Sequence, residues 1–228
     1  MSENVLEVFQ PEEGGLSGLK CIEDKLYALS SVKNCILVYF KNKTGGYALK
    51  DRIPLEIRNT SGITSDGNAL FVADSMEKVI YRIDMDTKQS RRFLDLRELK
   101  GENADAVIRA GNCTVNDMEI LNGEMWIACS AGYSSSILRI EAKSGKILKV
   151  IPARGPEPRS ISLDASSKCM RVLDSSNKEI SDFSLEGEWT GRRTGIPVEH
   201  PSCFSVDKNN KLIISSHNSM NGLKNREV

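Results

Sequence analysis

The chain has 228 residues, of which 39% are hydrophobic and 27% charged, and its 31 Lys and Arg are balanced by 31 Asp and Glu. This balance, without a basic run, excludes the usual electrostatic footprint of nucleic-acid binding, and no apolar window approaches the roughly 18 residues of a membrane span. The N-terminus has no basic segment followed by an apolar one, and no two of the six cysteines form a C-x-x-C pair. We therefore expect a cytoplasmic protein with free thiols, folded as one domain over residues 1–228.

A pattern of two strands recurs five times along the chain. Each copy has a short apolar strand, a turn of charged or small residues, and a second strand that ends in small polar residues. In chain order the copies are Ser17–Ile22 with Lys25–Ser30, Ser61–Ser65 with Ala69–Asp74, Asn116–Ile120 with Glu124–Cys129, Arg159–Leu163 with Cys169–Asp174, and Ser202–Val206 with Lys211–Ser216. The central apolar anchors, separated by 44, 55, 43 and 43 residues, are Leu19, Ile63, Met118, Ile161 and Phe204. This period is typical of a β-propeller blade.

Further strand-like segments lie between the copies. Four of them are rich in β-branched and aromatic residues, which favours a third strand: Ile36–Phe40, Val79–Ile83, Ile137–Ile140 and Glu179–Phe183. Segments such as Lys146–Ile151 then supply a fourth strand. Four strands per period predict an all-β fold, a single β-propeller of about five four-stranded blades, with six blades as the alternative. The predicted blades cover roughly 16–58, 59–112, 113–155, 156–198, and 199–228 together with 3–10.

The two ends of the chain are expected to complete one blade. The fifth copy reaches Val228 too soon for four strands, and Val5–Phe9 is a lone strand before the first copy. We predict that this N-terminal strand adds the outer strand of the last blade, which closes the ring without an open edge.

One mouth of the central channel is the expected place for a site. Each inner strand starts on the face where its blade's second strand ends, so these starts and the loops after the second strands converge there. The predicted ligand-binding residues are Ser17, Asp74, Asn116, Asp117, Tyr133, Arg159, Asp174, His200 and His217. The long second period places an insertion, residues 98–112, on the same face, where long loops often carry function.

Several of these residues have two interpretations. Asp74 and Asp174 end equivalent strands, and they either hold a hard cation such as Ca²⁺ or, as we favour, cap the turns that follow. His200 and His217 either bind a metal or share a proton, or are structural. Arg159 either grips a carboxylate or phosphate or braces neighbouring loops. No resident cofactor is predicted, and Ca²⁺ is the candidate cation.

The second blade carries a family resemblance. Ser61–Asp74 (SGITSDGNALFVAD), followed by Val79–Asp84 (VIYRID), resembles the repeats of the NHL, YVTN and gluconolactonase/regucalcin propellers. The likeness covers most of the chain as a blade pattern. In the gluconolactonase/regucalcin family it implies a divalent cation at the mouth, held by one Glu, Asn side chains and one Asp. Asn116 matches an Asn position of that set, whereas Ser17 and Arg159 stand where carboxylates are wanted.

Three functions follow from this pattern. The first is a monomeric ligand- or protein-binding propeller that holds a small molecule or a peptide at the channel mouth, with no nucleic-acid or membrane partner. The second is a metal-dependent hydrolase or lyase of the gluconolactonase-like type. The third is an acid–base enzyme that acts on a small organic substrate through Arg159, Asp117, Tyr133 or the histidines. The sequence carries no specific catalytic motif, which favours the first.

Overall fold

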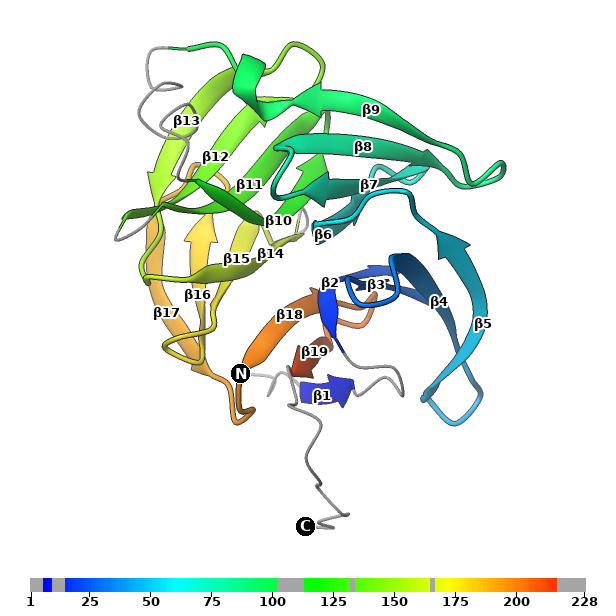
Figure 1. Cartoon of the computed structure of the whole chain (residues 1–228). Coiled ribbons are helices and arrows are strands. Elements are labelled where there is room, and N and C mark those ends of the chain that lie inside the picture. The colour runs from blue at the N-terminus through cyan, green and yellow to red at the C-terminus, as the bar shows by residue number, and fades with distance from the viewer. Residues whose placement is uncertain (1–5, 10–14, 102–112, 132–133, 165–166, 217–228) are drawn as a thin grey trace.

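Five β-sheets stand in a ring around a central axis in the computed structural model of the chain (Figure 1). The structure describes residues 6–9, 15–101, 113–131, 134–164 and 167–216. In four of the sheets the strands run from the inner to the outer edge in chain order, and in the fifth the N-terminal strand β1 lies at the outer edge of the described part. The chain is a five-bladed β-propeller, as the repeat predicted.

The blades are built from the following strands. The first blade contains β2 (Leu16–Ile22), β3 (Lys25–Ser30), β4 (Cys35–Lys41) and β5 (Tyr47–Pro54), and the second contains β6 (Thr60–Ser65), β7 (Ala69–Asp74), β8 (Val79–Asp84) and β9 (Ser90–Asp95). The third contains β10 (Thr114–Leu121), β11 (Glu124–Ala131), β12 (Ser134–Glu141) and β13 (Lys146–Pro152), and the fourth contains β14 (Pro158–Asp164), β15 (Cys169–Asp174), β16 (Glu179–Ser184) and β17 (Trp189–Gly195). The fifth contains β18 (Pro201–Val206), β19 (Leu212–Ser216) and β1 (Leu6–Phe9).

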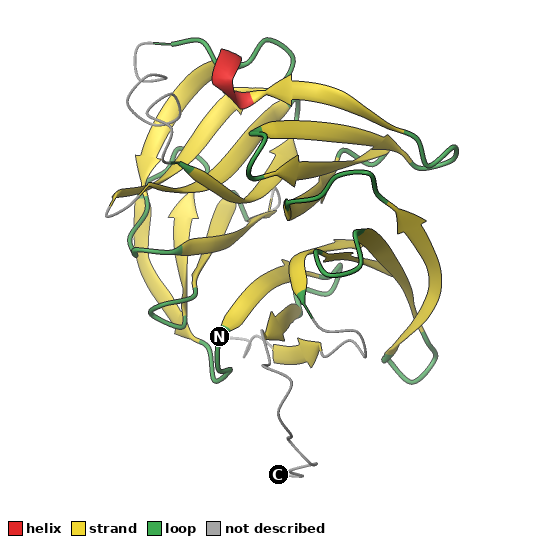
Figure 2. Ribbon diagram, in the orientation of Figure 1, coloured by secondary structure: helices red, strands yellow, loops and turns green. Residues whose placement is uncertain are grey.

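Strands make up nearly all the regular structure of the described residues (Figure 2). The exception is one short 3₁₀ turn, η1 (Leu96–Glu98), which follows β9. Within the described ranges, no helix is long and apolar enough to cross a membrane.

The N-terminal strand closes the ring, as predicted. β1 pairs with β19 in parallel, from Leu6 opposite Leu212 to Phe9 opposite Ser215. It therefore stands directly beside the second strand of the fifth blade, and this blade has three strands among the described residues. The pairing joins the two ends of the described chain. It also covers the edge of β19, which would otherwise be exposed.

Among the described residues the hydrophobic core consists of five clusters, one between each pair of neighbouring blades. Strand β7 shows the reason, since Phe71 packs toward the third blade while Leu70 and Val72 pack toward the first. Both faces of such a strand are buried, so its sequence is continuously apolar rather than alternating. Each repeat anchor packs against the preceding blade. All six cysteines are free thiols, and the four buried ones belong to these clusters.

Small residues occupy the positions directly before the anchors in four of the five inner strands. In chain order these positions hold Gly18, Gly62, Asp117, Ser160 and Cys203. A Cβ added at Gly62 would lie 2.5 Å from Asp117 Oδ1 and 2.6 Å from Asp117 Cα. The inner strands of the second and third blades therefore meet here at a distance that leaves room only for glycine.

A Gly62→Ala substitution is expected to lower the free energy of unfolding by about 1–3 kcal/mol. The atoms that the new Cβ would meet include backbone, which cannot move without disturbing the third blade. Gly195→Ala is the matched control, since a Cβ at Gly195 meets nothing within 4 Å. Urea unfolding followed by circular dichroism measures both. Equal midpoints for the two variants would contradict this close contact.

The start of the predicted insertion packs at the outer edge of the ring, away from the mouth where it was expected. Lys100 forms a parallel bridge with Lys146 at the start of β13, and Leu99 is buried in the cluster between the second and third blades. The apolar side chain of Leu99 is the physical reason, because burial between blades removes it from water. Residues 102–112 lie outside the described residues.

Candidate functional site at the channel mouth

A β-bulge interrupts each of the five inner strands at the same place. The pairing with the second strand shifts two positions before each anchor, at Ser17, Ser61, Asn116, Arg159 and Ser202. A bulge leaves its extra residue outside the ladder and re-aims the side chain. We call these five residues the bulge ring.

Four members of the bulge ring line one pocket with a volume of about 300 Å³: Ser17, Ser61, Asn116 and Arg159. The other hydroxyl-bearing residues of its wall are Ser31, Thr60, Ser75 and Thr114. The fifth member, Ser202, lines a neighbouring pocket of about 520 Å³ together with His200 and Lys178, and Arg159 belongs to both pockets. Arg159 therefore stands between the two hollows.

Three hydroxyls at the smaller pocket are buried without a partner. Within the described part of the chain, the side-chain oxygens of Ser17, Thr60 and Ser61 have no hydrogen-bond partner, and Thr60 is only 5% exposed. A buried hydroxyl without a partner costs about 1–3 kcal/mol, so such groups are rare in folded proteins. These three hydroxyls therefore leave hydrogen-bonding capacity unused at the wall of the pocket.

The Arg159 guanidinium is weakly held. Its Nη1 lies 3.7 Å from Glu157 Oε1, which is beyond hydrogen-bonding distance, and the side chain is 43% exposed. The other Glu157 oxygen accepts a hydrogen bond from Ser176 Oγ at 2.9 Å. Because an exposed ion pair of this kind contributes little to stability, the donors of Arg159 remain available.

Asp74 and Asp174 cap the turns after their strands. Asp74 Oδ1 accepts the backbone N–H groups of Met76 and Glu77, at 2.9 and 2.8 Å. Asp174 Oδ1 accepts the N–H of Asn177 at 2.7 Å, and its Oδ2 accepts an N–H just before β14 at 2.9 Å. These contacts agree with the favoured interpretation, and neither residue lines the two mouth pockets.

The remaining predicted site residues fall in different places. Asn116 donates from Nδ2 to Ser130 Oγ at 2.5 Å and to the Pro158 carbonyl at 2.9 Å, so it ties the third blade to the fourth. His200 is exposed and has a left-handed backbone with φ of 50°. Two predicted residues lie outside the described ranges, Tyr133 and His217.

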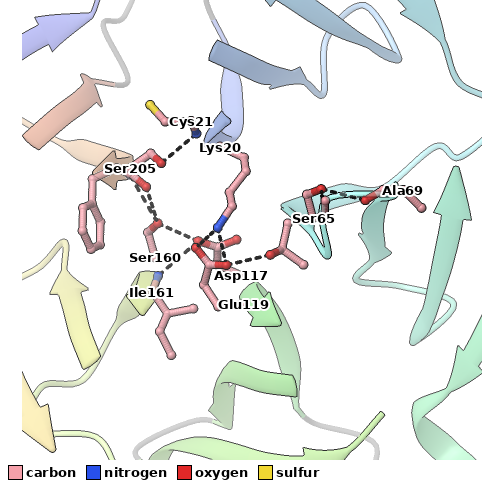
Figure 3. A network of polar contacts seen from close by, with 12 residues as sticks. Lys20, Cys21, Ser65, Ala69, Asp117, Glu119, Ser160, Ile161 and Ser205 are labelled. Atoms are coloured by element: carbon pink, nitrogen blue, oxygen red, sulfur yellow. Dashed lines mark hydrogen bonds and ion pairs between the residues drawn. The ribbon is translucent and has the colours of Figure 1, made fainter. Parts of the chain in front are cut away.

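Asp117 follows the bulge residue of β10, and its carboxyl joins the third blade to the fourth (Figure 3). Its Oδ2 accepts hydrogen bonds from Ser160 Oγ at 2.6 Å and from the Ile161 N–H at 3.1 Å. Its Oδ1 is buried beside Gly62, without a hydrogen-bond partner among the described residues. Burial raises the pKa of the Asp117 carboxyl from 3.8 to about 8. Asp117 lines neither mouth pocket, so its contacts assign it to the packing of the inner strands.

A charged cluster lies deeper along the inner strands, just past the anchors (Figure 3). The Lys20 ammonium donates to both Glu119 oxygens at 2.6 Å, and Thr64 Oγ1 donates to Glu119 Oε2 at the same distance. These three side chains connect the first, third and second blades. They share one offset from the anchors, one position after each, so the repeat already carried the signal that these side chains meet. Ser202 of the bulge ring was not among the residues expected at the mouth, although it too holds a fixed offset from its anchor.

The described residues offer a divalent cation few ligands. In that part of the chain no three His, Cys, Asp or Glu residues form a group that could hold a metal ion. Glu157 is the carboxylate among the residues that line the two mouth pockets, and Ca²⁺ prefers several oxygen ligands. These residues do not fit the cation that the family resemblance implies, and calcium binding stays a prediction.

Comparisons with known proteins support the fold. The sequence matches no protein-family model and no curated protein. The solved structure of a nidogen/laminin complex matches 90% of this chain and 73% of its own, with 16% identity and a TM-score of 0.57. Hydrazine synthase from Kuenenia stuttgartiensis matches 86% of this chain, with 13% identity and a TM-score of 0.51. This chain covers 53% of the hydrazine synthase chain, about half its length. At such identities the likeness extends to the fold alone.

Proposed function

We propose that this chain is a binding propeller that takes a small organic molecule at the bulge ring. The observation that carries the proposal is the coincidence of five equivalent bulges with three buried, unpartnered hydroxyls at one pocket. The pocket volume of about 300 Å³ lies at the lower end of the range of ligand sites, roughly 300–1,000 Å³. A bound molecule would satisfy the hydroxyls, which offsets the cost of burying them.

Binding is favoured over catalysis by the chemistry of the ring. Its five members supply three hydroxyls, an amide and a guanidinium. The ring contains no His, Asp, Glu, Lys, Tyr or Cys side chain, and these are the residue types that usually serve as general acids and bases. Asp117, whose pKa is raised to about 8, does not belong to the ring.

A Thr114→Trp substitution is expected to abolish binding of small molecules at the mouth. Thr114 is exposed and lines the smaller pocket, so an indole there fills the hollow without entering the core. The test is a screen of small organic molecules by thermal shift and by the amide resonances of ¹⁵N-labelled protein. Molecules that perturb the amides of Ser17, Ser61 and Asn116 should bind at least tenfold more weakly to the variant.

Lys50→Trp is the control, because Lys50 is exposed on the outer strand of the first blade. It should bind these molecules as the wild type does. A screen in which no molecule perturbs the mouth amides, or one in which Thr114→Trp leaves binding unchanged, would overturn the proposed function. Thermal shifts with millimolar Ca²⁺, Mn²⁺ and Zn²⁺ test the metal-dependent alternative in the same instrument.

A further inference from the structure

We propose that the molecule bound at the mouth carries a compact oxyanion, a carboxylate or a phosphate monoester, that binds against Arg159. This inference rests on the proposed function and names the chemical class of its ligand. Three features of the described residues carry it: the charge of the pocket wall, the unengaged state of the guanidinium, and the apolar side chains at the rim.

The wall of the smaller pocket supplies hydrogen-bond donors and no negative charge. Of its six hydroxyls, those of Ser31 and Ser75 already donate to backbone carbonyls, and both protons of the Asn116 amide are engaged within the protein. The remaining donors belong to Ser17, Thr60, Ser61, Thr114 and Arg159, and no carboxylate occurs among the described residues that line the pocket. A serine or threonine hydroxyl can turn its proton toward an acceptor oxygen. A carboxylate or phosphate offers several acceptor oxygens at once, and hydrogen bonds to a charged acceptor are stronger than neutral ones.

The guanidinium gives the pocket its preference for an anion. Arg159 makes no hydrogen bond within the described part of the chain, and its ion pair with Glu157 is long, at 3.7 Å. An arginine with free donors can hold a carboxylate or phosphate through two parallel hydrogen bonds. The adjoining pocket adds little net charge, because Lys178 pairs there with Glu199 at 2.5 Å and Glu157 lines the same pocket.

Two exposed apolar residues directly follow residues of the pocket wall in the sequence, and we call them the rim. Ser31 and Ser75 line the smaller pocket, and the residues after them, Val32 and Met76, are 65% and 75% exposed. The two are equivalent positions of the first and second blades, at the starts of the loops that follow β3 and β7. An oxyanion attached to an apolar ring or chain would match both the polar pocket and this rim.

The test compares phenyl phosphate and benzoate with their neutral counterpart, benzyl alcohol, as probes of ¹⁵N-labelled protein. We expect the two anions to perturb the amides of Ser17, Ser61 and Asn116 and to bind at least tenfold more tightly than benzyl alcohol. Arg159→Gln should weaken the anions at least tenfold and leave benzyl alcohol unchanged. Arg159→Lys keeps the positive charge but loses the pair of parallel hydrogen bonds that a guanidinium can make. Its affinity for the anions should therefore lie between those of the wild type and Arg159→Gln.

Arg193→Gln is the matched control. Arg193 is 45% exposed and lies 3.5 Å from its partner Glu179, much like Arg159 and Glu157, but it belongs to the outer strand β17. This variant should bind the anions as the wild type does. The oxyanion proposal would be wrong if benzyl alcohol bound as tightly as the anions, or if the anions bound the Arg159→Gln variant as tightly as the wild type. In either case the mouth would still be a binding site. If none of the probes perturbs the amides of Ser17, Ser61 and Asn116, the oxyanion proposal is wrong too. The Thr114→Trp screen tests the proposed function separately.

Discussion

A Lys20→Met substitution is expected to destabilise the folded state by about 3–5 kcal/mol. The Glu119 side chain is 4% exposed, and the Lys20 ammonium, 2.6 Å away, is its charged partner. Methionine keeps most of the volume of lysine but leaves a buried carboxylate that retains one neutral donor, Thr64 Oγ1. Urea unfolding at pH 7, followed by circular dichroism, measures the loss.

Two further variants separate the charge from the packing. Lys20→Met combined with Glu119→Gln should recover most of the lost stability, because no charge is then buried without a partner. Lys208→Met removes the lysine of an exposed pair, in which Lys208 and Asp24 are 54% and 61% exposed, and should cost less than about 1 kcal/mol. If Lys20→Met unfolded no more easily than Lys208→Met, the cluster could not be a structural connection between blades.

Asp117→Asn is expected to remove a large part of the pH dependence of stability. The folded-state pKa of this carboxyl is raised to about 8, chiefly by burial, from an ordinary value of 3.8. The contribution of Asp117 is therefore fully present below pH 4 and is lost as the pH rises through about 8. Between these limits the stability of the wild type falls by about 1.4 kcal/mol for each pH unit.

The variant has no carboxyl to ionise at this position. Its free energy of unfolding, relative to that of the wild type, should therefore rise from pH 4 to pH 8 and then stay constant. Urea unfolding at pH 4.5, 6, 7.5 and 9 measures the difference between the two proteins. Asp24→Asn, at an exposed position, controls for the loss of one negative charge. Parallel curves for the wild type and Asp117→Asn would show that the Asp117 carboxyl is ionised in the folded protein at all these pH values.

The repeat in the sequence was sufficient to predict the architecture. Five anchors near a period of 44 residues indicated five blades, and the lone strand before the first copy indicated how the ring closes. These predictions succeeded because strands buried on both faces leave a continuous apolar signature that is independent of the rest of the fold. They placed Ser17, Asn116 and Arg159 at the starts of inner strands, which is where the bulges lie.

The sequence by itself therefore determined the number of blades, the register of the repeat and the face on which a site is expected. Only the tertiary structure decided what each polar side chain does. It separated Arg159, with free donors at the mouth, from Asp74 and Asp174, whose oxygens accept backbone hydrogen bonds. It also joined the Asp117 carboxyl to the fourth blade and paired Lys20 with a glutamate two blades away. The physical reason is that blade register follows from local periodicity, whereas the partner of a polar group depends on strands 40 to 100 residues apart.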